Sequence, residues 1–247
     1  MYDPDLAEIY DDLYQHGMGK DYGAEAGELA ALLRAHHARI GDVLDVGCGT
    51  GLHLAAIRHQ FPHVEGVEPA AAMRAAAQTR LPDVLIHDGD MTSFDLSRTF
   101  SAVLCLFSTI GYATTEDRLH TTVVRLAAHT EPGGVVVIEP WFTPEQWRDN
   151  RVSHTIAATD ARTIIRMTRS TRDTEALSRM DMHYLVADHR TADPIRHFHD
   201  THVMGLSTEE QYQQAMTAAG LTRITTFAGW QPGRPRLLGI RPQAESR

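Results

Sequence analysis

The sequence predicts an α/β fold, in which a doubly wound, mostly parallel sheet of seven strands carries a small antiparallel β insert. Two observations predict it. Apolar runs typical of strands alternate with helix-compatible segments over residues 43–139, and over residues 141–206 this gives way to side chains that alternate with a period of two. Strands separated by helices form a parallel sheet. We therefore expect one domain, residues 1–247, in which residues 141–206 form an inserted antiparallel β subdomain.

The composition narrows the class of protein. The 247 residues carry a net charge of −9 without a segment rich in Lys or Arg, so we expect neither nucleic acid nor a membrane as a partner. Cys48 and Cys105 lie in apolar strand or turn context, which predicts buried, reduced thiols. No signal peptide opens the chain and no apolar run approaches the length of a membrane span, which favours a cytoplasmic protein.

Apolar side chains at helical spacing predict two helices in the N-terminal region. The first helix carries Leu6, Ile9, Tyr10 and Leu13. The second runs through residues 29–33. We expect Tyr10 to pack the first helix against the body of the protein.

Five apolar runs predict the parallel strands, with helices after the first, second and fourth. The expected strands are 43–47, 63–68, 84–87, 100–107 and 135–139. The expected helices run to about His59 and over 73–79 and 115–129. Near-continuous apolarity of the fourth run predicts burial on both faces of the sheet, and Pro132-Gly133-Gly134 is expected to turn the chain before the fifth.

The segments after the fifth strand predict the insert and the close of the sheet. The alternating segments of the insert are 163–168, 179–186 and 197–204. Ser207-Thr208-Glu209-Glu210 then predicts a helix N-cap, and Gly220 a C′ residue after the helix. Residues 221–227 and 237–240 are expected to form the closing antiparallel pair.

Residues 43–54, Val-Leu-Asp-Val-Gly-Cys-Gly-Thr-Gly-Leu-His-Leu, follow the order of strand, tight turn and helix. Gly47, Gly49 and Gly51 alternate through the turn. Glycine allows positive φ and close approach to a ligand, and a helix N-terminus offers unpaired N–H groups. In a parallel sheet, ligands bind beyond the carboxyl ends of the strands. The stretch therefore predicts a site for a nucleoside cofactor.

The spacing of the glycines and the acids beside them indicate which cofactor. A dinucleotide site has the pattern G-x-G-x-x-G, whereas this turn has G-x-G-x-G preceded by Asp45, and the second strand ends at Glu68. An acid at Asp45 repels a pyrophosphate but suits an ammonium and a sulfonium. These residues resemble the class I, Rossmann-like methyltransferases that depend on S-adenosylmethionine. A nicotinamide enzyme and a purely structural glycine turn are the alternatives.

The resemblance implies roles for the turn and for the acids. Gly47, Gly49 and Gly51 would pass beneath the methionine portion of the cofactor. Asp45 would bind its amino group, the alternative being that it caps N–H groups of the turn. Glu68 would accept both ribose hydroxyls, the alternative being an exposed surface acid.

Further cofactor contacts are implied at the ends of the third and fourth strands and in the N-terminal region. Asp90 and Met91 resemble the adenine site of the family, although Met91 is equally typical of core. Leu106, at the end of the fourth strand, would hold the methionine amine through backbone carbonyls. In many methyltransferases of this class an N-terminal segment closes over the cofactor, which makes Tyr14 and Tyr22 candidate cofactor ligands and Tyr2 a candidate pocket residue.

Motifs along nearly the whole chain resemble the nucleotide-linked aminosugar N-methyltransferases of antibiotic biosynthesis. They are Gly-Lys-Asp-Tyr (19–22), Cys-Leu-Phe-Ser-Thr-Ile-Gly-Tyr (105–112), Gly-Gly-Val-Val-Val-Ile-Glu-Pro-Trp (133–141), Met-His-Tyr-Leu-Val-Ala (182–187) and Glu-Gln-Tyr (210–212). The resemblance implies a dTDP-linked 3-amino-deoxyhexose as the substrate, methyl transfer to its nitrogen, usually twice, and a homodimer. It does not fix which hexose is used or whether the amine is at C3 or C4.

Tyr112 and Tyr2 are the candidate catalytic residues. That family often has histidine where this chain has Tyr112, so an imidazole role does not carry over to this position. The amine must attack in its neutral form, and tyrosine, with a reference pKa near 10, is a poor base. We expect Tyr112 to orient the nitrogen, with packing under the insert as the alternative, and catalysis to come mainly from proximity.

The substrate-binding candidates are Tyr2, Ser108, Tyr112, Trp141 and Arg234. Arg234 matches the family's Gly-Arg near the C-terminus and is expected to bind the diphosphate, with Arg236 as its rival. Trp141, like Trp147, is expected to stack on the thymine or the hexose, core packing being the alternative.

Other functions remain as alternatives. The same cofactor is compatible with a hydroxyl or another small natural product as the acceptor, although we find no good base for an alcohol near the fourth strand. A binding protein without turnover is the third alternative. His197, His199 and His202 suggest a metal site, but alternation places His202 on the opposite face from the other two, and we expect no metal.

Overall fold

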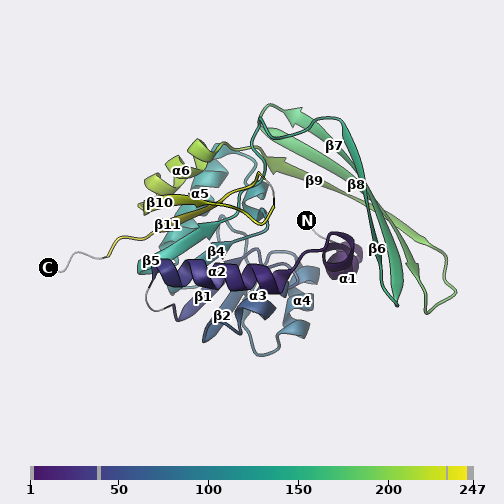
Figure 1. Ribbon diagram of the computed structural model, residues 1–247, viewed down its shortest axis with the longest axis horizontal. Coiled ribbons are helices and arrows are strands. Elements are labelled where there is room, and N and C mark those ends of the chain that lie inside the picture. The colour runs from purple at the N-terminus through teal and green to yellow at the C-terminus, as the bar shows by residue number, and fades with distance from the viewer. Residues whose placement is uncertain (1–2, 38–39, 232, 244–247) are drawn as a thin grey trace.

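The computed structural model describes residues 3–37, 40–231 and 233–243 and contains the two sheets that the sequence predicts (Figure 1). The larger sheet has seven strands in the order β3-β2-β1-β4-β5-β11-β10. They are β1 Asp42–Val46, β2 His63–Val67, β3 Ile86–His87, β4 Phe100–Cys105, β5 Thr130–Ile138, β10 Thr222–Phe227 and β11 Arg236–Ile240. Strands β1 to β5 are parallel, and β11 runs antiparallel to both β5 and β10. The predicted fold class is confirmed.

Helices cover both faces of the larger sheet. They are α1 Pro4–Asp12, α2 Tyr22–His36, α3 Leu52–Ile57, α4 Ala71–Arg80, α5 Glu116–Ala128 and α6 Glu209–Ala218, together with a π-helical turn η1 Leu13–Gly17 and a 3-10 turn η2 Thr109–Tyr112. One apolar core joins α2, α3 and α4 to the sheet, and a second joins α5 and α6 to its other face. As expected, every residue of β4 is buried.

Local signals account for where helix α6 begins and ends. The Thr208 side chain accepts a hydrogen bond from Gln211 N, and the Gln211 side chain accepts one from Thr208 N, which is a capping box. Gly220 follows the helix with φ +81°, a conformation that glycine adopts without strain. Both ends of this helix lie where the sequence predicts them.

The four-stranded sheet is antiparallel, in the order β6-β7-β8-β9. Its strands are β6 Arg151–Ala158, β7 Arg162–Thr174, β8 Leu177–Asp188 and β9 Arg196–Gly205. The alternating segments of the sequence predict only the last three of these strands, and β6 was not predicted.

The fifth strand of the larger sheet begins earlier than predicted. Strand β5 begins at Thr130, and its pairing with β4 shifts register between Thr130 and Val135, so the predicted turn at Gly133 is a bulge within the strand, with φ +83°.

Helix α1 connects the two sheets. Leu6, Ile9 and Leu13 are buried against the four-stranded sheet, whereas Tyr10 packs on Ala70 and Met73 beside the larger sheet. Figure 1 shows α1 between the larger sheet and the long strands β6 to β9. The strand order reverses between β1 and β4, and at such a switch point ligands bind beyond the strand ends. The insert and α1 therefore enclose the edge at which a ligand is expected.

Candidate active site

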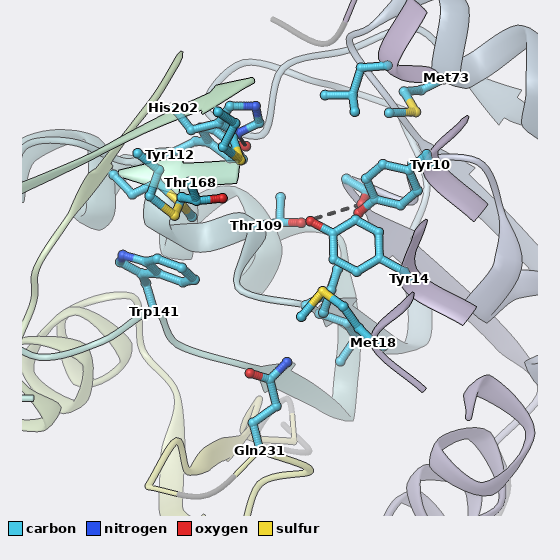
Figure 2. A pocket seen from close by; sticks show the side chains of 18 of the residues that line it. Tyr10, Tyr14, Met18, Met73, Thr109, Tyr112, Trp141, Thr168, His202 and Gln231 are labelled. Atoms are coloured by element: carbon cyan, nitrogen blue, oxygen red, sulfur yellow. Dashed lines mark hydrogen bonds between the residues drawn. The ribbon is translucent and has the colours of Figure 1, made fainter. Parts of the chain in front are cut away.

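A cavity of about 590 Å³ lies between the carboxyl ends of β1, β2 and β4 and the inner face of the four-stranded sheet. Its volume is within the range of ligand sites, about 300–1,000 Å³. Figure 2 shows that Tyr112, His202 and Trp141 line one side of it and Tyr10 and Tyr14 the other.

The glycine turn after β1 forms the floor of the cavity. Gly47 N donates to Val67 O at 2.7 Å. Gly47 has φ +76°, and a Cβ there would meet Thr109 Cγ2 at 2.3 Å, so this position requires glycine. Gly49 lines the cavity and has no neighbour within 4 Å of an added Cβ. Gly51, by contrast, does not line the cavity, since it precedes α3 and packs on Ala77.

Glu68 is buried at the end of β2, with 5% of its surface exposed. Its Oε2 accepts from Gly49 N at 2.9 Å, and its Oε1 accepts from Ala70 N at 2.8 Å. Burial raises the pKa of Glu68 although these hydrogen bonds oppose the shift. The alternative of an exposed surface acid is wrong. The carboxylate holds the turn, and each oxygen keeps a lone pair that can accept from a ligand in the cavity.

Asp45 lines the cavity from within β1 and is 2% exposed. Among the described residues its Oδ1 has no hydrogen-bond partner. Burial raises the pKa of Asp45 to about 6, and the nearby Glu68 carboxylate contributes to the rise. A buried carboxylate oxygen without a partner is costly, so the site favours a cation or a strong donor beside Asp45 Oδ1.

The ends of β3 and β4 place further predicted residues at the cavity. Asp90, Met91 and Leu106 line it. Met91 also belongs to a core cluster, so it has both of the environments that the sequence suggests, the cavity wall and the core. Ser108 is not among the lining residues, because it is buried behind them, donating to Pro140 O at 2.7 Å and accepting from Arg234 Nη1 at 2.9 Å.

Tyrosines of the N-terminal region form one wall. Tyr10, Tyr14 and Tyr22 all line the cavity, so Tyr10 does more than the packing expected of it. Tyr14 meets the Phe107 ring edge-on, with 5.0 Å between ring centroids, and Tyr22 meets His53 in the same way at 4.7 Å. Tyr2 lies outside the described residues, and its proposed role remains a prediction.

A buried cluster of Lys20, Glu25 and His53 lies beside this wall and was not predicted from the sequence. Lys20 Nζ lies 2.6 Å from Glu25 Oε2 and 4.2 Å from the centre of the Phe107 ring, and His53 Nε2 lies 2.7 Å from Glu25 Oε2. Burial would raise the pKa of Glu25, but the hydrogen bonds from His53 and Lys20 hold it below its usual value. Lys20 belongs to the Gly-Lys-Asp-Tyr motif, which was the available signal.

The four-stranded sheet turns a polar face toward the cavity. Ser153, Thr155, Arg166, Thr168 and Ser170 line it from β6 and β7. From β9, His202 lies beside Tyr112 of η2, and the Tyr112 hydroxyl is hydrogen-bonded to His202 Nδ1. His202 was noticed in the sequence only as a metal candidate. The alternation that set it apart from His199 was the signal that it faces inward.

Arg234 and Arg236 occupy different environments. Arg234 lines the cavity, is 4% exposed and lies 5.4 Å and 5.0 Å from the ring centres of Trp141 and Phe142. Burial lowers the pKa of Arg234 from its ordinary value. Arg236 instead donates to Ala228 O and is not among the lining residues. Trp141 and Trp147 both line the cavity.

The histidines of β9 divide between two faces, as predicted. His197 and His199 are exposed, and each stacks with His183 of β8, whereas His202 is buried on the other face. Within the described ranges, no group of three or more His, Cys, Asp or Glu side chains has the arrangement of a metal site. None of the described helices is both long and apolar enough to span a membrane.

Comparisons with known proteins give consistent results. The sequence matches a family model described as a methyltransferase domain over residues 43–134. It is 42% identical to a dTDP-3-amino-3,4,6-trideoxy-α-D-glucopyranose N,N-dimethyltransferase of Streptomyces venezuelae, over 97% of this chain and 99% of the other. It is 39% identical to a dTDP-4-amino-2,3,4,6-tetradeoxy-D-glucose N,N-dimethyltransferase of Saccharopolyspora spinosa, over 98% of this chain and 94% of the other.

Solved structures agree over the same length. The crystal structure of DesVI from Streptomyces venezuelae has 42% identity and a TM-score of 0.90, over 98% of this chain and 100% of the other. S-adenosylmethionine-bound CalS10, an amino pentose methyltransferase from Micromonospora echinaspora, has 38% identity and a TM-score of 0.83, over 98% of each chain. The similarity therefore includes the insert as well as the larger sheet.

Substituting Glu68→Gln is expected to destabilise the ligand-free protein. An amide presents its NH₂ group to one of the two backbone donors that Glu68 binds, and a buried donor without an acceptor costs about 1–3 kcal/mol. Urea unfolding would measure the loss. Glu175→Gln, at an exposed position, is the control and should change stability by less than about 0.5 kcal/mol. Equal stability of the two variants would contradict the structural role of Glu68.

Proposed function

Because this chain belongs to the S-adenosylmethionine-dependent N-methyltransferases of dTDP-linked amino sugars, we propose that it methylates the amino group of a dTDP-linked amino-deoxyhexose in antibiotic sugar biosynthesis. We propose a C3 amine and two successive transfers, giving an N,N-dimethylamino sugar. The observation that carries the proposal is one cavity that combines buried carboxylates at the strand ends with a buried guanidinium.

S-adenosylmethionine supplies a methyl group on a sulfonium, and the residues around the glycine turn fit it. Gly49 leaves room for close approach of a ligand, whereas Thr109 fills the space beside Gly47. The Asp45 oxygen that has no partner in the described chain suits the cofactor's ammonium group. Glu68 keeps acceptor capacity for the two ribose hydroxyls, and Asp90 and Met91 lie where an adenine would be bound. We propose these roles, with Tyr14, Tyr22 and Leu106 completing the site.

The opposite part of the cavity suits an anionic nucleotide sugar. Arg234 is cationic, buried and held by Ser108, and its Nε has no partner among the described residues. We propose that Arg234 binds the diphosphate, with Ser108 fixing the guanidinium. Arg148 and Arg151 line the same cavity from more exposed positions. Trp141 is proposed to stack on the thymine or the hexose.

The acceptor amine is proposed to lie at Tyr112, just beyond the end of β4. Methyl transfer is an in-line displacement, so holding the nitrogen against the sulfonium accounts for most of the rate gain. Tyr112 is proposed to orient the nitrogen, and Tyr2 remains a further candidate for the same site. Enclosure by α1 and the insert limits water.

The organisation of the chain also belongs to the proposal. We propose that residues 141–206 act as the substrate-binding insert of a single domain and that the protein works in the cytoplasm, as expected of a biosynthetic enzyme with reduced thiols. We propose a homodimer formed through the outer face of the insert. Val152, Ile156 and Met167 are 53%, 54% and 55% exposed on that face, and apolar patches of this kind mark interaction surfaces.

A substrate panel tests the reaction. Purified protein with labelled S-adenosylmethionine should methylate dTDP-3-amino-deoxyhexoses, and mass spectrometry should detect products with one and then two added methyl groups. A matched panel carries the amine at C4 or a hydroxyl in place of the amine. Methylation of the hydroxyl compounds alone would overturn N-methylation, and stronger turnover of the C4 amines would overturn the choice of C3.

Cofactor affinity is expected to depend on pH through Asp45. A cationic ammonium favours the ionised carboxylate, and the pKa of Asp45 is raised to about 6, so affinity should rise with pH up to about 6 and then level off. Calorimetry with S-adenosylhomocysteine should give roughly tenfold weaker binding at pH 5 than at pH 7. Asp45→Asn should flatten this dependence, and an unchanged slope in that variant would contradict the assignment.

The oligomeric state tests whether the outer face of the insert forms the dimer interface. Met167 lies between His154 of β6 and His183 of β8 on that face. Met167→Glu should convert a dimer to a monomer in light-scattering measurements, because it places a charge within an apolar interface. Leu85→Glu changes an exposed apolar residue outside the insert and should leave the dimer intact. A monomeric parent protein would refute the proposal.

A further inference from the structure

Two consecutive residues directly after β4 have a left-handed backbone. Phe107 has φ +51° and Ser108 has φ +60°, a region that residues with a Cβ atom rarely adopt. The other non-glycine residues of the described chain with positive φ, Ser97, Asn150 and Arg223, are isolated. Such backbone conformations persist only where the surrounding structure holds them, and they occur mainly at functional sites.

The segment that follows β5 holds this turn. The Glu139 side chain reaches the neighbouring strand end, where its Oε2 accepts from Phe107 N at 2.7 Å. Glu139 N donates to Cys105 O at 2.9 Å, which fixes the acid beside the end of β4. The Ser108 hydroxyl donates to Pro140 O at 2.7 Å. Each of the two left-handed residues is therefore tied by one hydrogen bond to the segment after β5.

The burial of Glu139 indicates a role beyond stability. The residue is 1% exposed, and within the described part of the chain its Oε1 has no hydrogen-bond partner. Burying a carboxylate oxygen without a partner is costly, and departures of this kind are expected at functional sites. A carboxylate accepts a stronger hydrogen bond from an N–H group than a neutral amide does. The acid is therefore suited to holding a turn that is unfavourable by itself.

Phe107 and Ser108 connect the turn to two walls of the cavity. The Phe107 ring lines the cavity. It meets the Tyr14 ring edge-on, with 5.0 Å between ring centroids, and Lys20 Nζ lies 4.2 Å from its centre. The Ser108 hydroxyl accepts from Nη1 of Arg234 at 2.9 Å. A change in the turn would therefore displace both the N-terminal wall and the guanidinium that is proposed to bind the diphosphate.

Thr109 connects the same turn to the floor of the cavity. It lines the cavity, where Figure 2 labels it, and its N–H donates to Leu106 O at 3.1 Å. Its methyl group fills the space beside Gly47, and its hydroxyl lies 3.5 Å from Gly47 O. The cofactor is proposed to lie over the glycine turn and the acceptor amine beyond the end of β4. The turn therefore lies at the junction of the two ligand sites.

We propose that Glu139 is a positioning residue for methyl transfer, which acts through the Phe107 N–H group to fix the distance between the methyl donor and the acceptor amine. The inference rests on the proposed N-methyltransferase function and adds to it a residue that is not among those lining the cavity. In-line transfer requires the reacting atoms to be held about 3–3.5 Å apart, and a displacement of about 1 Å can lower the rate about 100-fold. Loosening the turn lowers the rate, whereas each ligand keeps its own contacts.

Two small changes at Glu139 separate the hydrogen bond from the charge. Glu139→Asp keeps the carboxylate but is one methylene shorter, so Phe107 N loses its acceptor. Single-turnover methyl transfer at saturating ligand concentrations should fall about 10- to 100-fold. Affinities for S-adenosylhomocysteine and dTDP, measured by calorimetry, should stay within about threefold, because ground-state binding is unchanged. Glu139→Gln keeps a weaker acceptor at the same reach and should remain within about fivefold of the parent rate.

A double variant tests whether the effect passes through the strained turn. Glycine adopts the left-handed conformation without strain, so adding Glu139→Asp to Phe107→Gly should lower the rate by less than about threefold relative to Phe107→Gly alone. The same pair supplies the test if Glu139→Asp by itself does not fold. Glu175→Asp makes the matched change at an exposed position and should leave the rate unchanged.

The outcomes distinguish this role from packing and from the proposed function. A parent-like rate in Glu139→Asp would overturn the inference, as would an equal loss in Glu139→Gln or a parallel loss of ligand affinity. An undiminished loss in the Phe107→Gly background would also overturn it. If the parent protein methylates no amine while binding S-adenosylhomocysteine, the proposed function fails, and the inference fails with it.

Discussion

The apolar packing of α1 and of Leu13, the first residue of η1, holds the two halves of the site together. Leu6, Ile9 and Leu13 are buried against the four-stranded sheet, and Tyr10 packs on Met73 beside the larger sheet. Burial of each aliphatic side chain stabilises the contact by about 1.5–3 kcal/mol, whereas the exposed ion pairs between α1 and the insert add little. Because the cavity lies between these bodies, its dimensions depend on this helix.

Charge within the cavity is separated in a way that suits two different ligands. Asp45 and Glu68 are buried acids at the ends of β1 and β2, and Arg234 is a buried cation from the loop before β11. A ligand with an ammonium and a sulfonium is favoured at the acids, and a diphosphate at the guanidinium. Reversed placement of the two proposed ligands would set like charges together in a buried site, so the charges favour the proposed placement.

Much of the fold and the cofactor side of the site follow from local pattern. The order of strand, glycine turn and helix places Gly47, Asp45 and Glu68 at strand ends without tertiary information, and these positions line the cavity. Gly51 could not be separated from its neighbours by spacing, because its role depends on the packing of α4 against it. The environments of Arg234 and Arg236 likewise differ only once the loop before β11 is folded.

The missed strand and the missed histidine have one physical cause. In an ordinary half-exposed strand the apolar side chains face the core, but in β6 Ser153 and Thr155 face the cavity while Val152 and Ile156 are exposed. The sequence pattern identifies such a strand only if its apolar side chains are assumed to meet a second apolar surface, or its polar side chains a polar ligand. The same inversion places His202 inside. His202 of β9 is hydrogen-bonded to Tyr112 of η2, and alternation alone cannot reveal this contact.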